Sequence, residues 1–434
     1  MPGWKEVLTH FVSDVEDHYD LLKYRLRERL GGRDPLQILP YRGYGTQERL
    51  YLKGRVLEDK GIKGATESDS IWDNLVNMYK RFESDEIPYA RVLARFEGVR
   101  QQVVADEEGF FEVFIDLPEP PPADRLWHTI ELELLEPVRE GKPPARAEGH
   151  VLVPPPDAHF GVISDIDDTV IYTDATHLLN MARTVFLGSA RTRLPFKGVA
   201  AFYRALMHGV HGRITNPLFY VSSSPWNIYD LLADFFNLQD IPIGPVLFLR
   251  DWGLNEDELL PVKHMDYKLE TIQKILDTYP DLDFILIGDS GQEDPEIYYR
   301  IVGAYPGRIL AVYIRNVSRR LKRPEEIRAL AEEVIEAGST LILADDTYSL
   351  AEHAVEQGWI SAEALPDIKA EKERDEGPPT AIEELLGEGE EKEEGPTILV
   401  DGDRSEPVDE AVDDALDQGD EDSQAPPTVI VEGD

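Results

Sequence analysis

Side chains suited to phosphate chemistry recur where apolar runs end or where a helical pattern begins. In chain order they are Asp165, Asp167, Thr169, Ser222, Ser223, Lys268, Asp289 and Asp294. An isolated Asp-x-Asp pair after a strand is more typical of a turn or a helix cap than of a metal site. Turn chemistry does not explain the whole set in this order, so the set indicates a catalytic centre.

These residue types fit the cleavage of a phosphate ester. Phosphomonoesters are anionic, so an anionic nucleophile needs charge neutralisation before it can approach phosphorus. A lysine supplies fixed positive charge, and a serine hydroxyl can hydrogen-bond a phosphoryl oxygen. Mg²⁺ prefers oxygen ligands and usually takes one or two carboxylates together with phosphate. These residue types are therefore compatible with phosphate chemistry assisted by Mg²⁺.

The elements that must position these groups alternate between strands and helices. Six apolar runs are expected as strands: 160–164, 217–222, 245–249, 283–288, 308–314 and 340–345. Helical patterns lie between or after them at 198–209, 227–236, 267–276 and 324–338. Such alternation predicts an α/β fold with a doubly wound parallel sheet covered on both faces. Reactive groups are then expected at the carboxyl ends of the strands.

The part of the chain before residue 154 follows a different pattern. Residues 4–30 have the spacing of an amphipathic helix, which suits packing against the next domain better than a membrane surface. From about 36 to 153 short runs with a period of two predict a small β-sandwich, interrupted by a polar, partly helical insertion at 59–88. The predicted domains are 1–35 (amphipathic helix), 36–154 (β-sandwich), 155–368 (catalytic) and 369–434 (acidic disordered tail).

The composition excludes several classes of function. The chain has 44 basic and 85 acidic residues among 434, a net charge of −41, which disfavours nonspecific nucleic-acid binding. It has no cysteine, so disulfides and thiolate metal sites are absent. The N-terminus does not resemble a signal peptide, and no stretch is apolar enough to span a membrane. We therefore expect a cytoplasmic protein.

The acidic tail contains three copies of a Pro-Thr-aliphatic unit, at 379–382, 396–403 and 427–434. Two interpretations stay open. The copies are low-complexity drift, or they are short extended motifs that add a strand to the sheet edge of a protein partner.

The motifs resemble those of the haloacid dehalogenase superfamily of phosphohydrolases. SDIDDTV, YVSSSPWNIYDLL, FLRDWG, YKLETIQKIL and FILIGDSGQEDPEIYYRI are similar to the catalytic region of the actin-patch-type phosphatidate phosphatase family. TLILADDTYSLAEHA and YRGYGTQERLYLKGRVL also match, so the resemblance covers residues 36–365. Lipins share the catalytic plan but typically carry Gly where this chain has Asp168, which favours the actin-patch branch.

The resemblance implies a role for each motif residue. Asp165 is the nucleophile that becomes an aspartyl phosphate, and Asp167 is the general acid and base. Asp165, the Asp167 carbonyl and Asp289 are the implied Mg²⁺ ligands, with Asp294 holding metal-bound waters. Substrate phosphate would be bound by the motif hydroxyls of Thr169 and Ser222 (or its neighbour Ser223). Lys268 (or Lys263) is the implied catalytic lysine, which supplies fixed positive charge to the transition state.

The resemblance also implies a lipid phosphate, phosphatidate or a relative, as the substrate. The sequence leaves alternatives open: a soluble phosphorylated metabolite, or an interaction protein with residual catalysis. Anionic membranes repel a protein of this charge unless a local basic face compensates. Three interpretations stay open for Arg183, Arg191, Arg193 and Lys197: they hold a phosphate, form such a face, or make exposed ion pairs. Peripheral membrane contact is therefore left open.

Overall fold

The computed structural model describes most of the chain between residues 35 and 375. The described ranges are 35–59, 86–139, 141–166, 198–226, 229–250, 261–317, 323–375 and 398–399. The predicted helix at 4–30, most of the predicted insertion, and the first and third tail copies lie outside these ranges. So do Asp167, Asp168, Thr169 and the four basic residues at 183–197.

A largely parallel sheet forms in the second half of the chain. Its strands are β9 (Gly161–Asp165), β10 (Leu218–Pro225), β11 (Val246–Arg250), β12 (Phe284–Asp289), β13 (Ile309–Arg315), β14 (Thr340–Ala344) and β15 (Ile398–Leu399). The spatial order is β11-β10-β9-β12-β13-β14-β15, and only β15 is antiparallel to its neighbour. All six apolar runs expected as strands are found. Their continuous apolar character follows from burial on both faces, complete along β9 and β12.

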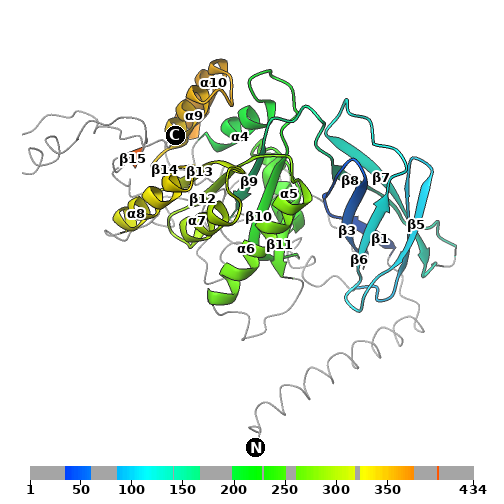
Figure 1. Cartoon of the computed structure of the whole chain (residues 1–434). Coiled ribbons are helices and arrows are strands. Elements are labelled where there is room, and N and C mark those ends of the chain that lie inside the picture. Colours follow the sequence, from blue (N-terminus) through cyan, green and yellow to red (C-terminus); the bar gives the residue numbers. More distant parts are fainter. Residues whose placement is uncertain are drawn as a thin grey trace, which may run out of the picture.

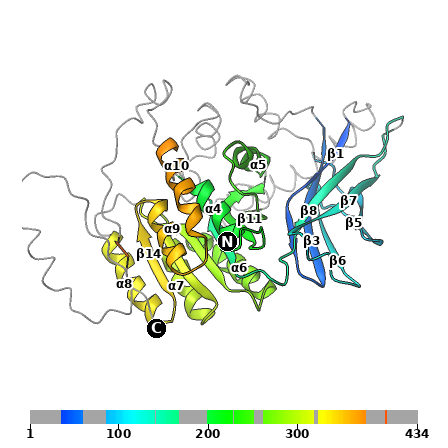
Figure 2. The ribbon, with the colours of Figure 1, turned by 90° about the horizontal axis from the view of Figure 1, so that it is seen from above.

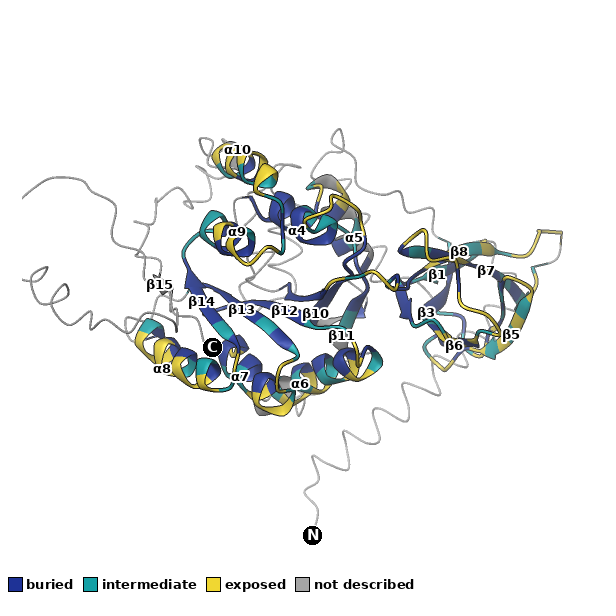
Figure 3. Cartoon of the chain, turned by 45° about the horizontal axis from the view of Figure 1, so that its top comes forward, coloured by how far each residue is buried: buried dark blue, intermediate teal, exposed yellow. Residues whose placement is uncertain are grey.

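Helices lie on both faces of this sheet. They are α4 (Val199–His208), α5 (Tyr229–Leu238), α6 (Pro261–Thr278), α7 (Asp294–Ala304), α8 (Arg323–Glu336), α9 (Thr347–Glu356) and α10 (Leu365–Asp375), with a 3₁₀ turn, η3 (Ala362–Ala364), before α10. In Figure 3, α6, α7 and α8 cover one face, and α4, α5, α9 and α10 cover the other. The view from above in Figure 2 separates the same two groups. A mixed α/β architecture with a parallel sheet is therefore confirmed.

The first half of the chain forms a separate group of mostly antiparallel strands beside the parallel sheet (Figure 1). They are β1 (Leu36–Pro40), β2 (Gly43–Gly45), β3 (Arg49–Glu58), β4 (Arg91–Phe96), β5 (Val99–Val104), β6 (Phe110–Asp116), β7 (Trp127–Glu136) and β8 (Arg146–Leu152). We call this group the β module. Alternating buried positions along β4, β6 and β7 supply a core of its own.

Hydrogen bonds join all eight strands of the β module into one connected sheet, in which β6 branches from β3. A sandwich requires two separate sheets packed face to face. The predicted β-rich character is found, but the division into two sheets is not confirmed.

The end of the described chain returns to the parallel sheet. Helix α10 continues beyond the predicted tail boundary at 368, and its Glu371 carboxylate accepts from the Ala201 amide at 2.7 Å and pairs with Arg204 at 2.6 Å. Glu371 thereby satisfies an amide in the first turn of α4, which has no side-chain cap of its own. Further on, Ile398 and Leu399 of the second tail copy pair with Leu343 and Ile342 at the edge of β14.

Among the described residues, no helix has the length and apolar character needed to cross a bilayer.

Candidate active site

The carboxyl edge of the parallel sheet brings together residues from three adjacent strands. Asp165 ends β9 and Asp289 ends β12, on one side of it. On the other side Val221 of β10 is the register partner of Asp165, so Ser222 follows at the same edge. Asp165, Ser222 and Asp289 are all buried. Parallel pairing thus explains why residues far apart in sequence meet here.

Lys268, from α6, is the cation of this site. Its Nζ lies 2.7 Å from Asp165 Oδ1 and also pairs with Asp294 Oδ1. Burial alone would lower the pKa of Lys268, but the Asp165 and Asp294 carboxylates outweigh burial and raise that pKa above its ordinary value. The lysine therefore stays charged and forms a bridge between two acids from different motifs.

Asp289 and Asp294 are held by the loop that follows β12. The amides of Gly291 and Gln292 donate to Asp289 Oδ1 at 2.6 and 2.9 Å. The Asp289 amide in turn donates to Asp294 Oδ2 at 3.1 Å. A Cβ on Gly288 would collide with the Asp294 carboxylate, so glycine is required for the approach of Asp294. The loop thus orients both carboxylates through the backbone.

Three buried carboxylates, those of Asp165, Asp289 and Asp294, each offer an oxygen within 4.8 Å of the others. Lys268 pairs with two of these carboxylates, those of Asp165 and Asp294. Buried charge is unfavourable unless it is compensated. An all-oxygen, anionic donor set suits a hard divalent cation such as Mg²⁺. The residues present therefore fit the predicted cofactor.

Arg323, the first residue of α8, clamps the loop after β12. Its guanidinium donates to the Ser290 carbonyl at 3.0 Å and to the Gln292 carbonyl at 2.8 Å, and pairs with both oxygens of Glu296. The side chain is buried. The sequence analysis missed this residue because it is one of several basic residues in a polar stretch, and no local pattern marks its long-range contacts.

Ser164 and Tyr203, which lie next to Asp165, were not predicted from the sequence either. The Ser164 hydroxyl donates to the Asp165 carbonyl at 2.7 Å and lies 2.8 Å from the Tyr203 hydroxyl. Burial raises the pKa of Tyr203, so its hydroxyl stays neutral. Tyr203 faces β9 from α4, and only its place on the buried face of a predicted helix could have suggested it.

Comparisons with known proteins agree with this geometry. Residues 160–316 match the family model described as "Phosphatidate phosphatase APP1, catalytic domain". The resemblance to the actin-patch-type phosphatidate phosphatase family is confirmed. The matched segment contains Asp165, Ser222, Lys268, Asp289 and Asp294.

Two relatives resemble the chain over part of their length. One is "Phosphatidate phosphatase APP1" of Saccharomyces cerevisiae, 33% identical over 184 residues, which are 42% of this chain and 30% of that protein. The other is an uncharacterized protein of Schizosaccharomyces pombe, 26% identical over 241 residues, 54% of this chain and 38% of that protein. The chain thus matches well under half the length of either relative.

A solved structure, a carbohydrate acetylesterase from Xanthomonas citri, is 13% identical with a TM-score of 0.25, covering 68% of this chain and 72% of that chain. A TM-score this low establishes no common fold.

The structure brings together most of the residues predicted for a site of the actin-patch type. Asp165, Lys268, Asp289 and Asp294 are in one cluster, and Ser222 lies at the adjoining strand end. The two alternatives, Ser223 and Lys263, belong to β10 and α6. Asp167 and Thr169 lie outside the described residues. The chemical role of each residue stays a prediction.

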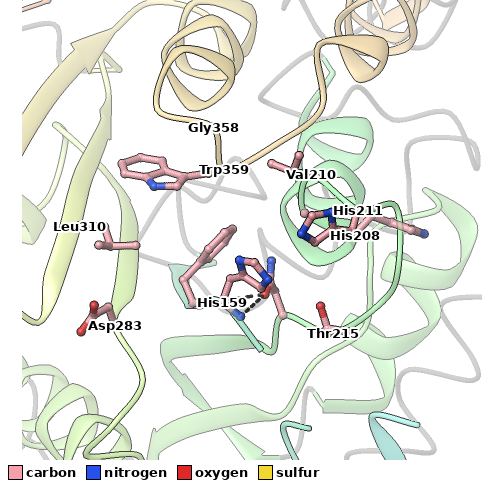
Figure 4. Close-up of a pocket in the computed structure, with 12 residues that line it drawn as sticks. His159, His208, Val210, His211, Thr215, Asp283, Leu310, Gly358 and Trp359 are labelled. Atoms are coloured by element: carbon pink, nitrogen blue, oxygen red, sulfur yellow. Dashed lines mark hydrogen bonds between the residues drawn. The ribbon is translucent and has the colours of Figure 1, made fainter. Parts of the chain in front are cut away.

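A separate cavity of about 220 Å³ lies at the opposite, amino-terminal edge of the sheet (Figure 4). It is lined by residues that precede or begin the strands, including His159 before β9 and Asp283 before β12, and by His208, His211 and Trp359. None of the residues predicted to be catalytic lines it. The two edges of the sheet are therefore chemically distinct.

Proposed function

We propose that this protein is a Mg²⁺-dependent phosphomonoester hydrolase that acts through an aspartyl phosphate on Asp165, with phosphatidate or a related lipid phosphate as its substrate. The observation that carries the proposal is the cluster of Asp165, Asp289, Asp294 and Lys268 at the carboxyl edge of a parallel sheet. In support, the strand order reverses direction between β9 and β12 and helices cover both faces, as expected for a haloacid dehalogenase-like, doubly wound domain.

The proposed reaction has two displacements at phosphorus. In the first, an Asp165 carboxylate oxygen forms a bond to phosphorus while the ester P–O bond breaks, and Asp167 gives its proton to the departing alkoxide. In the second, Asp167 removes a proton from water, the water oxygen attacks phosphorus, and the bond to Asp165 breaks. The products are the free alcohol and inorganic phosphate, and Asp167 is again protonated.

Lys268 has two duties in this scheme. Its ammonium group holds Asp165 in place at 2.7 Å and supplies fixed positive charge where the phosphoryl oxygens gather charge in the transition state. Because two acids raise its pKa, it does not compete as a proton donor near neutral pH. The proton transfers therefore fall to Asp167.

The acids of the cluster would hold the cofactor. Asp165 and Asp289 would provide direct carboxylate ligands with the Asp167 carbonyl, and Asp294 would hold metal-bound water. When bound, Mg²⁺ would neutralise charge on the phosphoryl oxygens. The loop clamp by Arg323 and the two amides on Asp289 keep this ligand oriented before any metal arrives.

A lipid substrate is supported by the yeast relative, which is named as a phosphatidate phosphatase. The net charge of −41 argues for a soluble ester instead. The test measures phosphate release from phosphatidate in mixed micelles beside a panel of soluble monophosphates, with and without EDTA and added Mg²⁺. Asp165→Asn is the matched control because it retains side-chain volume but removes the nucleophile.

We expect release from phosphatidate to exceed release from the soluble panel, to stop with EDTA, and to vanish in Asp165→Asn. Activity on soluble esters alone would keep the mechanism and reject the lipid. Activity that survives EDTA would reject the metal, and near-normal turnover by Asp165→Asn would reject the nucleophile. A folded protein that hydrolyses none of the esters would support an interaction role.

A further inference from the structure

We propose that Tyr41 of the β module is a positioning residue for the Ser222 end of the active site. The inference deepens the proposed function and rests on it at one point, namely that Ser222 binds the phosphoryl group. Its structural content, that the β module holds the end of β10 in place, stands on packing alone. Tyr41 lies outside the segment that matches the catalytic family model.

The segment after Ser222 leaves the regular pairing of the sheet. Pairing of β10 with β9 extends only as far as Val221 and Asp165. On the other side, Ser222 pairs with Phe248 of β11, and the register shifts before the next pair, Pro225 with Arg250. Regular ladder hydrogen bonds therefore do not explain how the end of β10 is fixed, and Pro225 has no amide to donate. The next described side chain is Trp226.

Trp226 is anchored by the β module. Its ring centroid lies 4.5 Å from that of Tyr41, with the rings inclined by 31°, and Trp226 is only 9% exposed. Tyr41, which is 2% exposed, also meets the Tyr229 ring of α5 edge-on at 4.8 Å. Aromatic pairs at such distances stabilise beyond their buried area. Tyr41 therefore lies between the strand end that carries Ser222 and the helix that follows.

The β module presents Tyr41 rigidly. The Tyr41 amide donates to the Lys53 carbonyl at 2.9 Å, and the Arg42 amide donates to the Tyr229 hydroxyl at 2.9 Å. A Cβ on Gly43 would collide with the Tyr51 carbonyl, so the turn after Tyr41 needs glycine to lie this close to β3. The Lys53 ammonium lies 5.0 Å from the centre of the Trp226 ring.

A second contact reinforces the joint between the two parts. The Tyr279 hydroxyl at the end of α6 donates to the Gly45 carbonyl at 3.0 Å, and Tyr44 lies edge-on to Phe219 of β10. Tyr41 and Tyr44 belong to the hydrophobic core of the parallel sheet, whereas the β module has a distinct core of its own. The β module is thus built into the catalytic unit at β10.

A hydroxyl that binds a phosphoryl group must be placed precisely, because small misplacements of a catalytic group cost large factors in rate. Loss of the Tyr41 ring should free the end of β10 and leave the carboxylate cluster intact. We expect Tyr41→Ala to reduce kcat/KM roughly 10- to 100-fold, with Mg²⁺ affinity unchanged. Tyr41→Phe retains the ring and should be close to the parent protein.

The experiment compares full-length Tyr41→Ala, Tyr41→Leu and Tyr41→Phe with the parent and with Phe96→Ala. Phe96 is a buried aromatic of the β module's own core, which is distinct from the core that contains Tyr41, so its loss controls for general destabilisation. Native-state hydrogen exchange of peptides covering 217–226 and 284–289 is measured beside steady-state kinetics. If Tyr41→Ala does not fold, hydrogen exchange and kinetics of Tyr41→Leu test the inference instead.

We expect faster exchange in 217–226, unchanged exchange in 284–289, and recovery in Tyr41→Phe. Unchanged exchange in 217–226, or an equal increase in Phe96→Ala, would overturn the inference. If exchange behaves as expected but the parent hydrolyses no ester, the positioning role stands and the proposed function fails.

Discussion

The two edges of the parallel sheet use polar residues in opposite ways. At the amino-terminal edge, Asn216 is buried; its carbonyl oxygen accepts from the His159 amide at 3.0 Å, and its amide donates to the Leu206 carbonyl at 2.8 Å. At the carboxyl edge, the Asp165 and Asp294 carboxylates converge on one lysine. At the amino-terminal edge, Asn216 completes the hydrogen bonds of backbone groups. At the carboxyl edge, the carboxylates and the lysine bring several charges close together.

This difference indicates which edge can do chemistry. A neutral side chain that completes backbone hydrogen bonds lowers the free energy of the folded state and has little left to offer a ligand. Like charges crowded in a buried cluster are costly and are typical of sites that bind a metal or an anionic substrate. The cavity of about 220 Å³ lies at the amino-terminal edge, away from the carboxylate cluster, so the charge arrangement is a better guide than the presence of a cavity.

The sharpest test of this comparison is Lys268→Met at the carboxyl edge. Loss of the ammonium group should reduce kcat about 10²- to 10³-fold, because fixed charge on the transition state disappears. The measurement is phosphate release under saturating substrate. Lys372→Met is the matched control. Lys372 forms a similar ion pair with Asp346, at a distance of 2.9 Å, and this pair does not belong to the carboxylate cluster. Equal losses in both variants would mean that the cluster has no special role.

The next test weakens the loop that presents Asp289. Arg323→Lys keeps the charge but cannot reproduce the fork that reaches the Ser290 and Gln292 carbonyls together with Glu296. Arg323 acts on Asp289 only through the Gln292 backbone, whose amide donates to Asp289, so we expect Mg²⁺ affinity to fall by roughly 10-fold. Magnesium titration by calorimetry measures it, with Arg328→Lys of the same helix as the control. Unaltered affinity would show that the clamp serves stability only.

Sequence pattern predicted the carboxyl edge well because the site is tied to strand ends. Asp165, Ser222 and Asp289 follow apolar runs, and parallel pairing alone brings such positions together. Arg323 and Tyr41 were not predictable, because their contacts depend on the packing of distant elements. Trp226 lies within one of the matched motifs, but its contact with Tyr41 is visible only in the folded structure. A period of two in the sequence predicts strands but does not say how many sheets they form. The predicted division of the β module into two sheets therefore went beyond what the pattern supports.

At the amino-terminal edge, Asn216→Ala should affect stability and leave catalysis unchanged. The variant leaves the His159 amide and the Leu206 carbonyl without their partner in a buried place. Each such loss costs about 1–3 kcal/mol, so the free energy of unfolding should fall by roughly 3 kcal/mol. Urea unfolding measures this, and kcat of the folded fraction is measured beside it. A large fall in kcat at unchanged stability would contradict the division between the edges.

The smallest expected effect concerns His353 of α9, which packs against Trp359, a lining residue of the cavity at the amino-terminal edge. Its ring is 5.6 Å from Trp359 and hydrogen-bonds the Tyr313 hydroxyl at 2.8 Å. Burial lowers the pKa of His353 from 6.5 to about 4. Between these values the unfolded chain binds a proton that the folded chain does not, so stability falls as the pH falls through this window.

The parent protein should therefore lose about 2 kcal/mol more than His353→Gln between pH 7 and pH 5. Urea unfolding at the two pH values measures the difference, and His159→Gln controls for the loss of an exposed histidine at the same edge. The sign of this change in the free energy of unfolding is decisive. A histidine with a carboxylate partner in the folded state would instead make the protein more stable at low pH. Equal pH dependence in the parent and His353→Gln would mean that His353 gains a proton without unfolding. A buried charge would then also be tolerated near the amino-terminal edge, and the contrast between the two edges would narrow to the cluster of three buried carboxylates.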